Sequence, residues 1–166
     1  RAKWDAAFCD FSKNGYRLPT DSEWEYAARG GKKSQSNSGG TDYIYAGSND
    51  ICEVAWYWDN TDGTSCTVNG YYGTNPVATK KENELDLYDM SGNVSEWCWN
   101  RYGDTYPQGT PNNNVQSSGS SVRVVRGGGW YTNSIEPSGC NVWRNSTALP
   151  YTRASNVGFR VACKGE

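Results

Sequence analysis

The 166-residue sequence contains no histidine. This absence excludes an imidazole general base, a Ser-His-Asp triad and the common zinc sites. Long apolar runs are few, which disfavours a helical bundle or a doubly wound sheet, and neither a signal peptide nor a transmembrane span is visible. We therefore expect a loop-rich protein without direct membrane insertion. Because the sequence starts at Arg1 rather than at Met, we expect a fragment or a processed product.

A large excess of charge is also missing. The formal net charge is -2, and basic residues cluster only at Lys32–Lys33 and Lys80–Lys81. Clusters this short cannot follow a phosphate backbone, so we expect no nucleic-acid partner.

Cysteine pairs with metal-ligand spacing are absent as well. The 6 cysteines include no C-x-x-C motif, which disfavours a zinc ribbon or a thioredoxin-like site. Cys52 and Cys66 flank one loop and could form a disulfide, whereas Cys9, Cys98 and Cys163 lie in apolar settings that suit buried thiols. The sequence leaves the oxidation state of the cysteines open.

Aromatic residues and glycine are abundant, with 8 Trp, 12 Tyr and 19 Gly. Trp and Tyr bury large areas but need polar partners, which predicts a compact aromatic core among irregular loops. An apolar stripe predicts a helix at Ala2–Lys13. A capping box formed by Thr20 and Glu23 predicts a second helix within Arg17–Arg29, with Trp24 on its buried face.

Strands are expected at Asn75–Thr79, Val122–Arg126 and Asn156–Cys163. The run of three glycines at Gly127–Gly129 stands directly before Trp130. This pattern predicts that two backbone segments approach each other closely in the core.

The segment Leu87–Trp99 places two carboxylates, Asp89 and Glu96, on either side of a tight Ser-Gly-Asn turn. Buried carboxylates without partners are costly, so both need a counter-charge or hydrogen bonds. One interpretation is a bound calcium ion, which prefers several oxygen ligands from a flexible loop. The other is that Asp89 caps the turn and Glu96 pairs with Arg126 or Arg160.

Four segments together resemble the formylglycine-generating-enzyme (sulfatase-modifying factor) domain, a variant of the C-type lectin fold. They are Tyr16–Gly31, Asn83–Asn100, Arg123–Trp130 and Asn156–Ala162. The resemblance implies an α+β fold with two helices, short antiparallel strands and much irregular loop. It also implies a single domain over residues 1–166, in which the family's earlier strands, upstream of Trp4, are missing.

The resemblance does not carry over the family's oxidase site. Active members bind copper through two cysteines shortly after the residue that matches Trp130, at positions that here hold Thr132 and Pro137. Cys140 stands alone nearby, and a pair of thiolates is what would hold Cu(I). We therefore predict no copper, no catalytic residues and no enzymatic activity.

The resemblance does carry over a calcium site. It implies side-chain oxygens from Asp89 and Glu96 and backbone carbonyl oxygens from Gly92 and Val94. We therefore predict a structural calcium ion at these four residues.

The segment Tyr131–Ser155 is rich in Asn, Ser, Thr and Tyr with isolated Trp and Arg, which is the composition of an antibody-like binding surface. Its position between GGGW and GFRV resembles the variable proteins of diversity-generating retroelements, whose C-terminal codons are rewritten. An ordinary polar surface loop is the other interpretation. The predicted ligand-binding residues are Tyr131, Thr132, Asn133, Ser134, Asn141, Trp143, Asn145, Ser146, Thr147, Tyr151, Thr152, Ala154 and Ser155.

Together these features predict a non-enzymatic, receptor- or adhesin-like domain. We expect a monomer at a bacterial cell surface or outside the cell that binds an unidentified protein or other macromolecule. Its core anchors are expected to be Trp130, Phe159, Trp97 and Trp99. The alternatives are a calcium-dependent carbohydrate lectin, suggested by Glu136–Ser138, or a catalytically altered relative of the copper-dependent oxidase.

Overall fold

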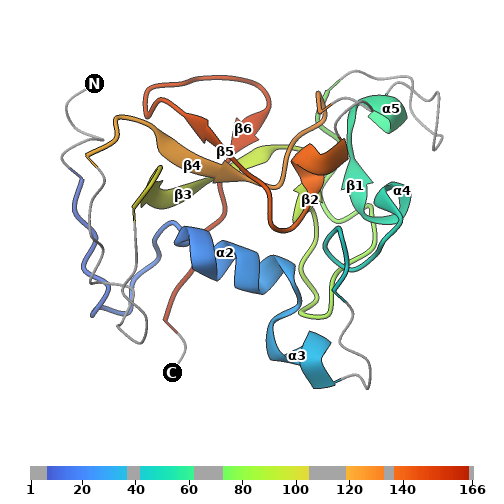
Figure 1. The fold of residues 1–166 in the computed structure, drawn as a ribbon, viewed down its shortest axis with the longest axis horizontal. Helices are drawn as coiled ribbons and strands as arrows, with labels where there is room; N and C mark the ends of the chain where they lie inside the picture. Colours follow the sequence, from blue (N-terminus) through green and yellow to red (C-terminus); the bar gives the residue numbers. More distant parts are fainter. Residues whose placement is uncertain (1–6, 37–41, 62–72, 105–118, 133–136, 165–166) are drawn as a thin grey trace.

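The computed structural model describes residues 7–36, 42–61, 73–104, 119–132 and 137–164 (Figure 1). Within these ranges no helix is both long enough and apolar enough to cross a membrane. The elements are, in chain order, α2 (Asp21–Ala28), α3 (Gly31–Ser36), α4 (Ile51–Val54), β1 (Ala55–Trp56), α5 (Trp58–Thr61), β2 (Ser91–Gly92), β3 (Ser95–Arg101), β4 (Arg123–Arg126), the 3-10 helix η1 (Pro137–Cys140), β5 (Asn145–Ala148) and β6 (Val157–Gly158).

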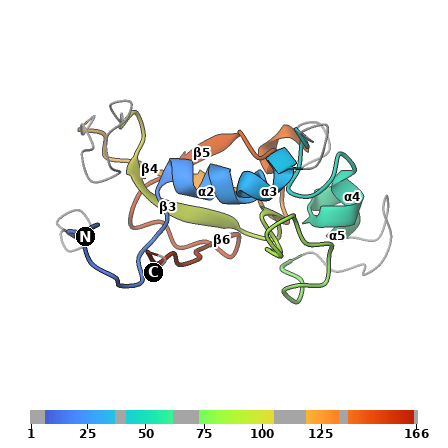
Figure 2. The same ribbon diagram turned by 90° about the horizontal axis from the view of Figure 1, so that it is seen from below.

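The described strands form one main sheet and one small pair. The main sheet has the order β5-β4-β3-β6, in which β4 is antiparallel to both neighbours and β6 is parallel to β3. Helix α2 lies across one face of this sheet, as Figures 1 and 2 show. The parallel pair β1–β2 lies beside the sheet, next to α4 and α5. Since β5 and β6 are at opposite edges, residues 149–156 connect one edge of the sheet to the other.

Helix α2 begins where the sequence predicts. The Thr20 hydroxyl accepts a hydrogen bond from the Glu23 backbone N–H, and the Glu23 carboxylate accepts one from the Thr20 N–H. This reciprocal capping box satisfies two N–H groups that the first turn would otherwise leave unpaired. Trp24 and Ala28, one turn apart, are both 1% exposed and pack into the core under the sheet. The predicted buried face is therefore confirmed.

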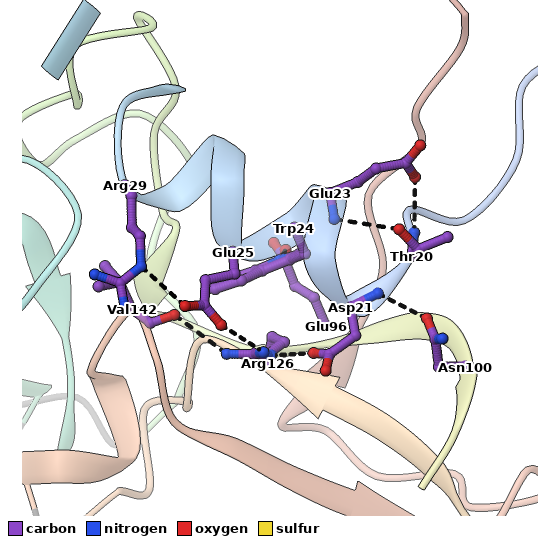
Figure 3. Close-up of polar contacts among 10 residues, drawn as sticks. All are labelled: Thr20, Asp21, Glu23, Trp24, Glu25, Arg29, Glu96, Asn100, Arg126 and Val142. Atoms are coloured by element: carbon purple, nitrogen blue, oxygen red, sulfur yellow. Dashed lines mark hydrogen bonds and ion pairs between the residues drawn. The ribbon is translucent and has the colours of Figure 1, made fainter. Parts of the chain in front are cut away.

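Arg126 of β4 joins this helix to the sheet, as Figure 3 shows. Its Nε donates to the Asp21 carboxylate, and its Nη2 donates to Glu25 at 2.9 Å. Nη1 donates to the Val142 carbonyl oxygen at 3.2 Å. One buried guanidinium thus holds α2, β4 and the segment before β5 in fixed positions.

Two of the predicted elements are wrong in the described residues. Residues 7–13 of the expected helix Ala2–Lys13 are not helical, and its other residues lie outside the described ranges. Asp10 accepts hydrogen bonds from the backbone N–H and hydroxyl of Ser12, and such local bonds compete with a helix. The expected strand Asn75–Thr79 is a turn, in which Ala78 has φ of 59°.

The two other predicted strands are present in shortened form. Strand β4 takes up most of Val122–Arg126, while Asn156–Cys163 contains only β6 and an isolated bridge at Ala162.

The core differs from the one expected. Phe159 is 69% exposed, and Trp97, Trp99 and Trp130 are only half-buried, so none of these four anchors belongs to the fully buried core. One buried cluster instead contains Trp24, Ala28, Ala46, Met90, Cys98, Val124 and Val142, and a second contains Tyr45, Val54, Ala55, Tyr57 and Cys140.

The cysteines fall into three groups. Cys52 is disulfide-bonded, and Cys66, its expected partner, lies outside the described residues. Cys98 is a free, fully buried thiol, as predicted. Cys9 is free but half-buried and Cys163 is free and exposed, so the expectation of burial is wrong for Cys163.

Candidate ligand-binding site

The face of the main sheet opposite α2 carries a groove. Val124 packs into the core with Trp24, and Arg126 reaches α2, so Val125 between them points to the other face. Ser146 of β5 is its antiparallel partner. Two adjoining hollows, of about 280 and 400 Å³, share Val125, Ser146, Ser95 and Tyr131. We call the two together the outer-face groove.

The walls of the outer-face groove come largely from residues predicted to contact a ligand. None of those that line it is buried, and Tyr131 is 53% exposed. Among the described lining residues Arg144 is the single charged one. A small-residue, weakly charged groove with one aromatic wall resembles the surfaces by which antibodies bind proteins. The predicted residues that line it are Tyr131, Thr132, Asn145, Ser146, Thr147, Thr152 and Ala154.

The remaining predicted ligand contacts do not line the groove. Trp143 and Tyr151 are 47% and 49% exposed, and Ser155 is exposed as well. Asn141 is 7% exposed and follows buried Cys140, so it is not presented at the surface. Asn133 and Ser134 lie outside the described residues.

Gly127 and Gly128 line the groove and pack closely against the core. Gly128 has φ of 66°, and a Cβ atom there would lie 2.8 Å from the Cys140 Sγ. A Cβ atom on Gly127 would lie 3.2 Å from the Trp24 ring. The predicted close approach after β4 is therefore confirmed.

Sequence reasoning missed the part of the groove that the scaffold supplies. Ser95, Val125, Asn156 and Val157 line it, although none belongs to the variable-looking composition. The alternation along β4 could have placed Val125 on the face opposite Val124. Nothing in the sequence showed that residues 149–156 would pass beside it.

Cys140 is the cysteine nearest in sequence to the family's oxidase positions, and it is fully buried. Burial raises the pKa of its thiol to about 12, although a hydrogen bond with Thr132 acts in the opposite direction. At neutral pH the thiol is therefore protonated and inaccessible, whereas a copper ligand must be a thiolate.

The Glu96 carboxylate pairs with Arg160, one of the two interpretations left open by the sequence. Arg160 Nε and Nη2 each donate to a different Glu96 oxygen at 2.6 Å, and Trp24 Nε1 donates to the same carboxylate at 2.6 Å. Arg160 Nη2 also reaches the Asp89 carbonyl oxygen at 3.3 Å. The guanidinium thus lies between Glu96 and Asp89.

The three other predicted calcium ligands are Asp89, Gly92 and Val94. Asp89 accepts a hydrogen bond from the Ala78 N–H at 2.9 Å through Oδ2, and its buried Oδ1 has no partner among the described residues. Gly92 lies in β2, and the Val94 side chain lies 3.0 Å from where a Cβ atom on Gly158 would be. A calcium ion that shared Glu96 would lie beside a guanidinium cation, so these residues do not fit a four-ligand site while Arg160 holds this position. The calcium site stays a prediction.

The sequence of residues 2–164 matches the family described as the sulfatase-modifying factor enzyme 1-like domain. Chaperone protein LppX of Paenibacillus barcinonensis is 44% identical over 77% of this chain and 42% of its own length. The formylglycine-generating enzyme of Streptomyces coelicolor is 32% identical over 96% of this chain and 50% of its own length. Inactive C-alpha-formylglycine-generating enzyme 2 of Bos taurus is 31% identical over 96% of this chain and 48% of its own length.

A solved structure, Treponema denticola variable protein 1, superposes with a TM-score of 0.75 at 36% identity, over 99% of this chain and 53% of that one. The chain therefore spans about half the length of the proteins it matches. These similarities confirm the expected α+β fold of the C-type lectin type and the expected resemblance to variable proteins. The chain belongs to the sulfatase-modifying factor enzyme 1-like domain family.

Proposed function

We propose that this chain is a non-enzymatic ligand-binding domain whose ligand contacts lie along the outer-face groove. One observation carries the proposal: seven residues chosen from the sequence as variable line a single groove, and none of the seven is buried. They come from the turn after β4, from edge strand β5 and from the connection between β5 and β6. Residues scattered over an ordinary polar loop have no reason to converge in this way.

The part of the fold opposite the groove is held together by contacts that do not involve groove residues, so the groove sequence can change. Helix α2, its capping box and Arg126 fix the opposite face of the sheet without using any groove residue. Substitutions at exposed positions usually alter stability by about 0.5 kcal/mol or less. The groove can therefore accept many sequences while the fold stays the same. The similarity to Treponema denticola variable protein 1 supports this function.

Three observations support the absence of catalysis. The sequence has no histidine, Thr132 occupies one of the expected copper positions, and Cys140 is a buried, protonated thiol. Relatives include both active and inactive formylglycine-generating enzymes, so family membership alone does not decide the matter. We extend the proposal to display on a bacterial surface and to a protein or other macromolecule as ligand.

A library experiment tests the groove as a binding surface. Tyr131, Ser146, Thr147, Thr152 and Ala154 are randomised together, and the library is selected against lysozyme as a test protein. We expect folded, specific binders. A matched library at five exposed positions away from the groove should yield few, and equal yields would contradict the assignment. The control positions are Ser22, Tyr26, Lys33, Lys81 and Tyr102.

Two further observations separate the alternatives. The gene neighbourhood should contain a near-copy of the 3′ end that differs mainly at adenines, together with a reverse transcriptase gene. Their absence would remove the retroelement interpretation. Oxygen uptake with a cysteine-containing peptide and copper would instead support an altered oxidase, and glycan binding abolished by a chelator would support a lectin.

A further inference from the structure

Strand β5 forms one edge of the main sheet. In the order β5-β4-β3-β6 it pairs with β4 alone among the described strands, and each of its 4 residues has a partner there. Ser146 and Thr147 are exposed, and Figure 2 shows β5 at one border of the molecule. The open side of an edge strand presents backbone N–H and C=O groups to which another strand can bind.

Hollows lie on both sides of this edge. Ser146 pairs with Val125 and lines the outer-face groove. Asn145 pairs with Arg126, which reaches α2, and it lines both the outer-face groove and a second hollow of about 330 Å³. We call this second hollow the helix-side hollow. Its lining includes Asp21, Asn100, Arg101, Asp104, Val124 and Asn145.

The helix-side hollow is lined by a residue whose hydrogen-bond donor has no partner. Asn100 is 3% exposed, and its Oδ1 accepts from the Asp21 N–H at 2.7 Å, as Figure 3 shows. This bond fixes the orientation of the amide, and its Nδ2 is buried with no partner among the described residues. The Asp21 and Asp104 carboxylates add acceptors, while Arg126 pairs with Asp21 and Arg101 lies beside Asp104. A neutral group that both accepts and donates, such as a side-chain amide or hydroxyl, matches this lining.

We propose that the ligand is bound as an extended polypeptide segment that pairs with the open edge of β5 and places alternate side chains in the two hollows. This inference rests on the proposed function, because the outer-face groove is one of the two hollows. Side chains of a strand alternate between the faces of a sheet, so a strand added beside β5 meets both hollows. A ligand helix has a period of 3.6 residues and cannot place every second side chain in the same hollow.

This mode of binding also suits a groove whose sequence changes. When a strand is added to a sheet edge, main-chain hydrogen bonds supply affinity and the flanking pockets select side chains. The main-chain bonds of β5 are the same whatever side chains its residues carry. Substitutions at Ser146 or Thr147 therefore change which segment is selected without removing the edge that binds it.

Proline tests the edge because it has no backbone N–H to donate. Along a strand, N–H groups alternate in direction, so of Ser146 and Thr147 one N–H faces β4 and the other faces the open edge. Ser146→Pro and Thr147→Pro are both made, with Ser146→Ala and Thr147→Ala as matched controls for the lost side chains. The proline that interrupts the β4 ladder should lower Tm by more than about 5 °C. The other, which we call the edge variant, should have a Tm near that of its alanine control.

The probe is a displayed library of short unstructured peptides that is selected against the wild-type domain. Selected peptides should bind the edge variant at least about tenfold more weakly than its alanine control, because main-chain bonds are lost. Alanine substitutions along a selected peptide should weaken binding at every second position. Equal binding to the edge variant and its control, or sensitivity at every third or fourth position, would overturn the inference.

A selection that yields no peptide also counts against the edge. If the groove library described above still yields lysozyme binders, the edge inference is wrong and the proposed function stands. If both selections fail, neither stands.

Amide hydrogen exchange tests the edge without a substitution. A bound peptide should slow exchange of the β5 amide that faces the open edge at least about tenfold, while amides of the β4–β5 ladder change little. A peptide held only by its side chains would leave β5 exchange unchanged and would contradict the proposal. Sedimentation of the free domain provides the last check, because a dimer that the edge variant dissociates would make a second copy the occupant of the edge and overturn the assignment.

Discussion

Arg160 binds the carboxylate of Glu96 through two parallel hydrogen bonds of 2.6 Å, one to each oxygen. The same guanidinium donates to the Tyr88 carbonyl oxygen at 3.1 Å, and Glu96 also accepts from Trp24 of α2. The pair therefore connects three segments that are far apart in the sequence: α2, the segment Leu87–Trp99 and the residues after β6. Bidentate contacts of this kind fix orientation as well as charge.

Removing one partner of this pair should destabilise the fold. We expect Arg160→Met to lower the free energy of unfolding by about 3 kcal/mol, because Glu96, 5% exposed, would keep a buried charge without a counter-charge. Arg160→Lys should recover only part of this loss, because an ammonium group cannot form the fork. Unfolding in urea measures the free energy of unfolding of both variants.

The exposed pair Lys81–Glu53 is the control for that measurement. Its side chains are 54% and 50% exposed, so Lys81→Met should leave unfolding unchanged within error. If Arg160→Met changed the free energy of unfolding as little as Lys81→Met, the ion pair between Arg160 and Glu96 would not contribute to stability.

Local signals predicted the parts of the fold that local contacts determine. Thr20 and Glu23 are three residues apart, so the capping box that starts α2 could be read directly. The close approach at Gly127 and Gly128 likewise followed from a glycine run. For the first predicted helix, hydrogen bonds between Asp10 and Ser12 prevailed over an apolar stripe.

Contacts between distant segments could not be predicted in the same way. The outer-face groove depends on the register that places Val125 of β4 opposite Ser146 of β5. The amino-acid composition of two strands does not determine which of their residues pair. Phe159 was expected in the core because its segment resembles that of a family, yet it is exposed in this chain. Similarly, the choice of Arg160 rather than Arg126 as the partner of Glu96 required the tertiary structure.

Gly92 should tolerate no side chain. A Cβ atom there would lie 2.4 Å from the Trp56 carbonyl oxygen and 2.7 Å from the Trp56 nitrogen, and backbone atoms cannot move aside cheaply. We expect Gly92→Ala to reduce folded yield sharply and to lower Tm in what remains. Gly119 separates strain from crowding, since its φ of +71° resembles the +78° of Gly92 but no atom of the described residues beyond its chain neighbours lies within 4 Å of its Cβ position. Gly119→Ala should cost only about 1 kcal/mol, and equal effects would show that φ alone matters.

Stability should decline in alkaline solution because of the buried thiols. Burial raises the pKa of Cys140 from 9.0 to about 12 and raises that of Cys98 as well. Above pH 9 the unfolded chain releases protons that the folded chain retains, so the free energy of unfolding falls as pH rises, by about 1.4 kcal/mol per pH unit for each thiol. The contribution is complete below pH 9. Urea unfolding between pH 8 and 10.5 gives this slope.

Alanine variants assign the alkaline slope to particular thiols. Cys140→Ala should reduce the pH dependence of the free energy of unfolding by the contribution of one thiol. This holds even if the substitution also changes the free energy of unfolding at neutral pH. Cys163→Ala, at an exposed position, serves as the control and should keep the wild-type slope. An unchanged slope in Cys140→Ala would mean that other groups cause the decline.

The exposed aromatics of the Tyr131–Ser155 segment should contribute little to the stability of the fold. Tyr131, Trp143 and Tyr151 are 53%, 47% and 49% exposed, and the one cation–ring contact of Trp143 among the described residues is a 5.9 Å approach by Arg29. Replacing all three by Ala should change the free energy of unfolding by about 1.5 kcal/mol or less, since exposed positions contribute about 0.5 kcal/mol each or less. Trp24→Ala, at a residue 1% exposed, should cost about 3–5 kcal/mol and shows what loss of a core aromatic looks like. A triple variant as unstable as Trp24→Ala would place these aromatics in the core of the fold, and a surface that the fold depends on could not be rewritten freely.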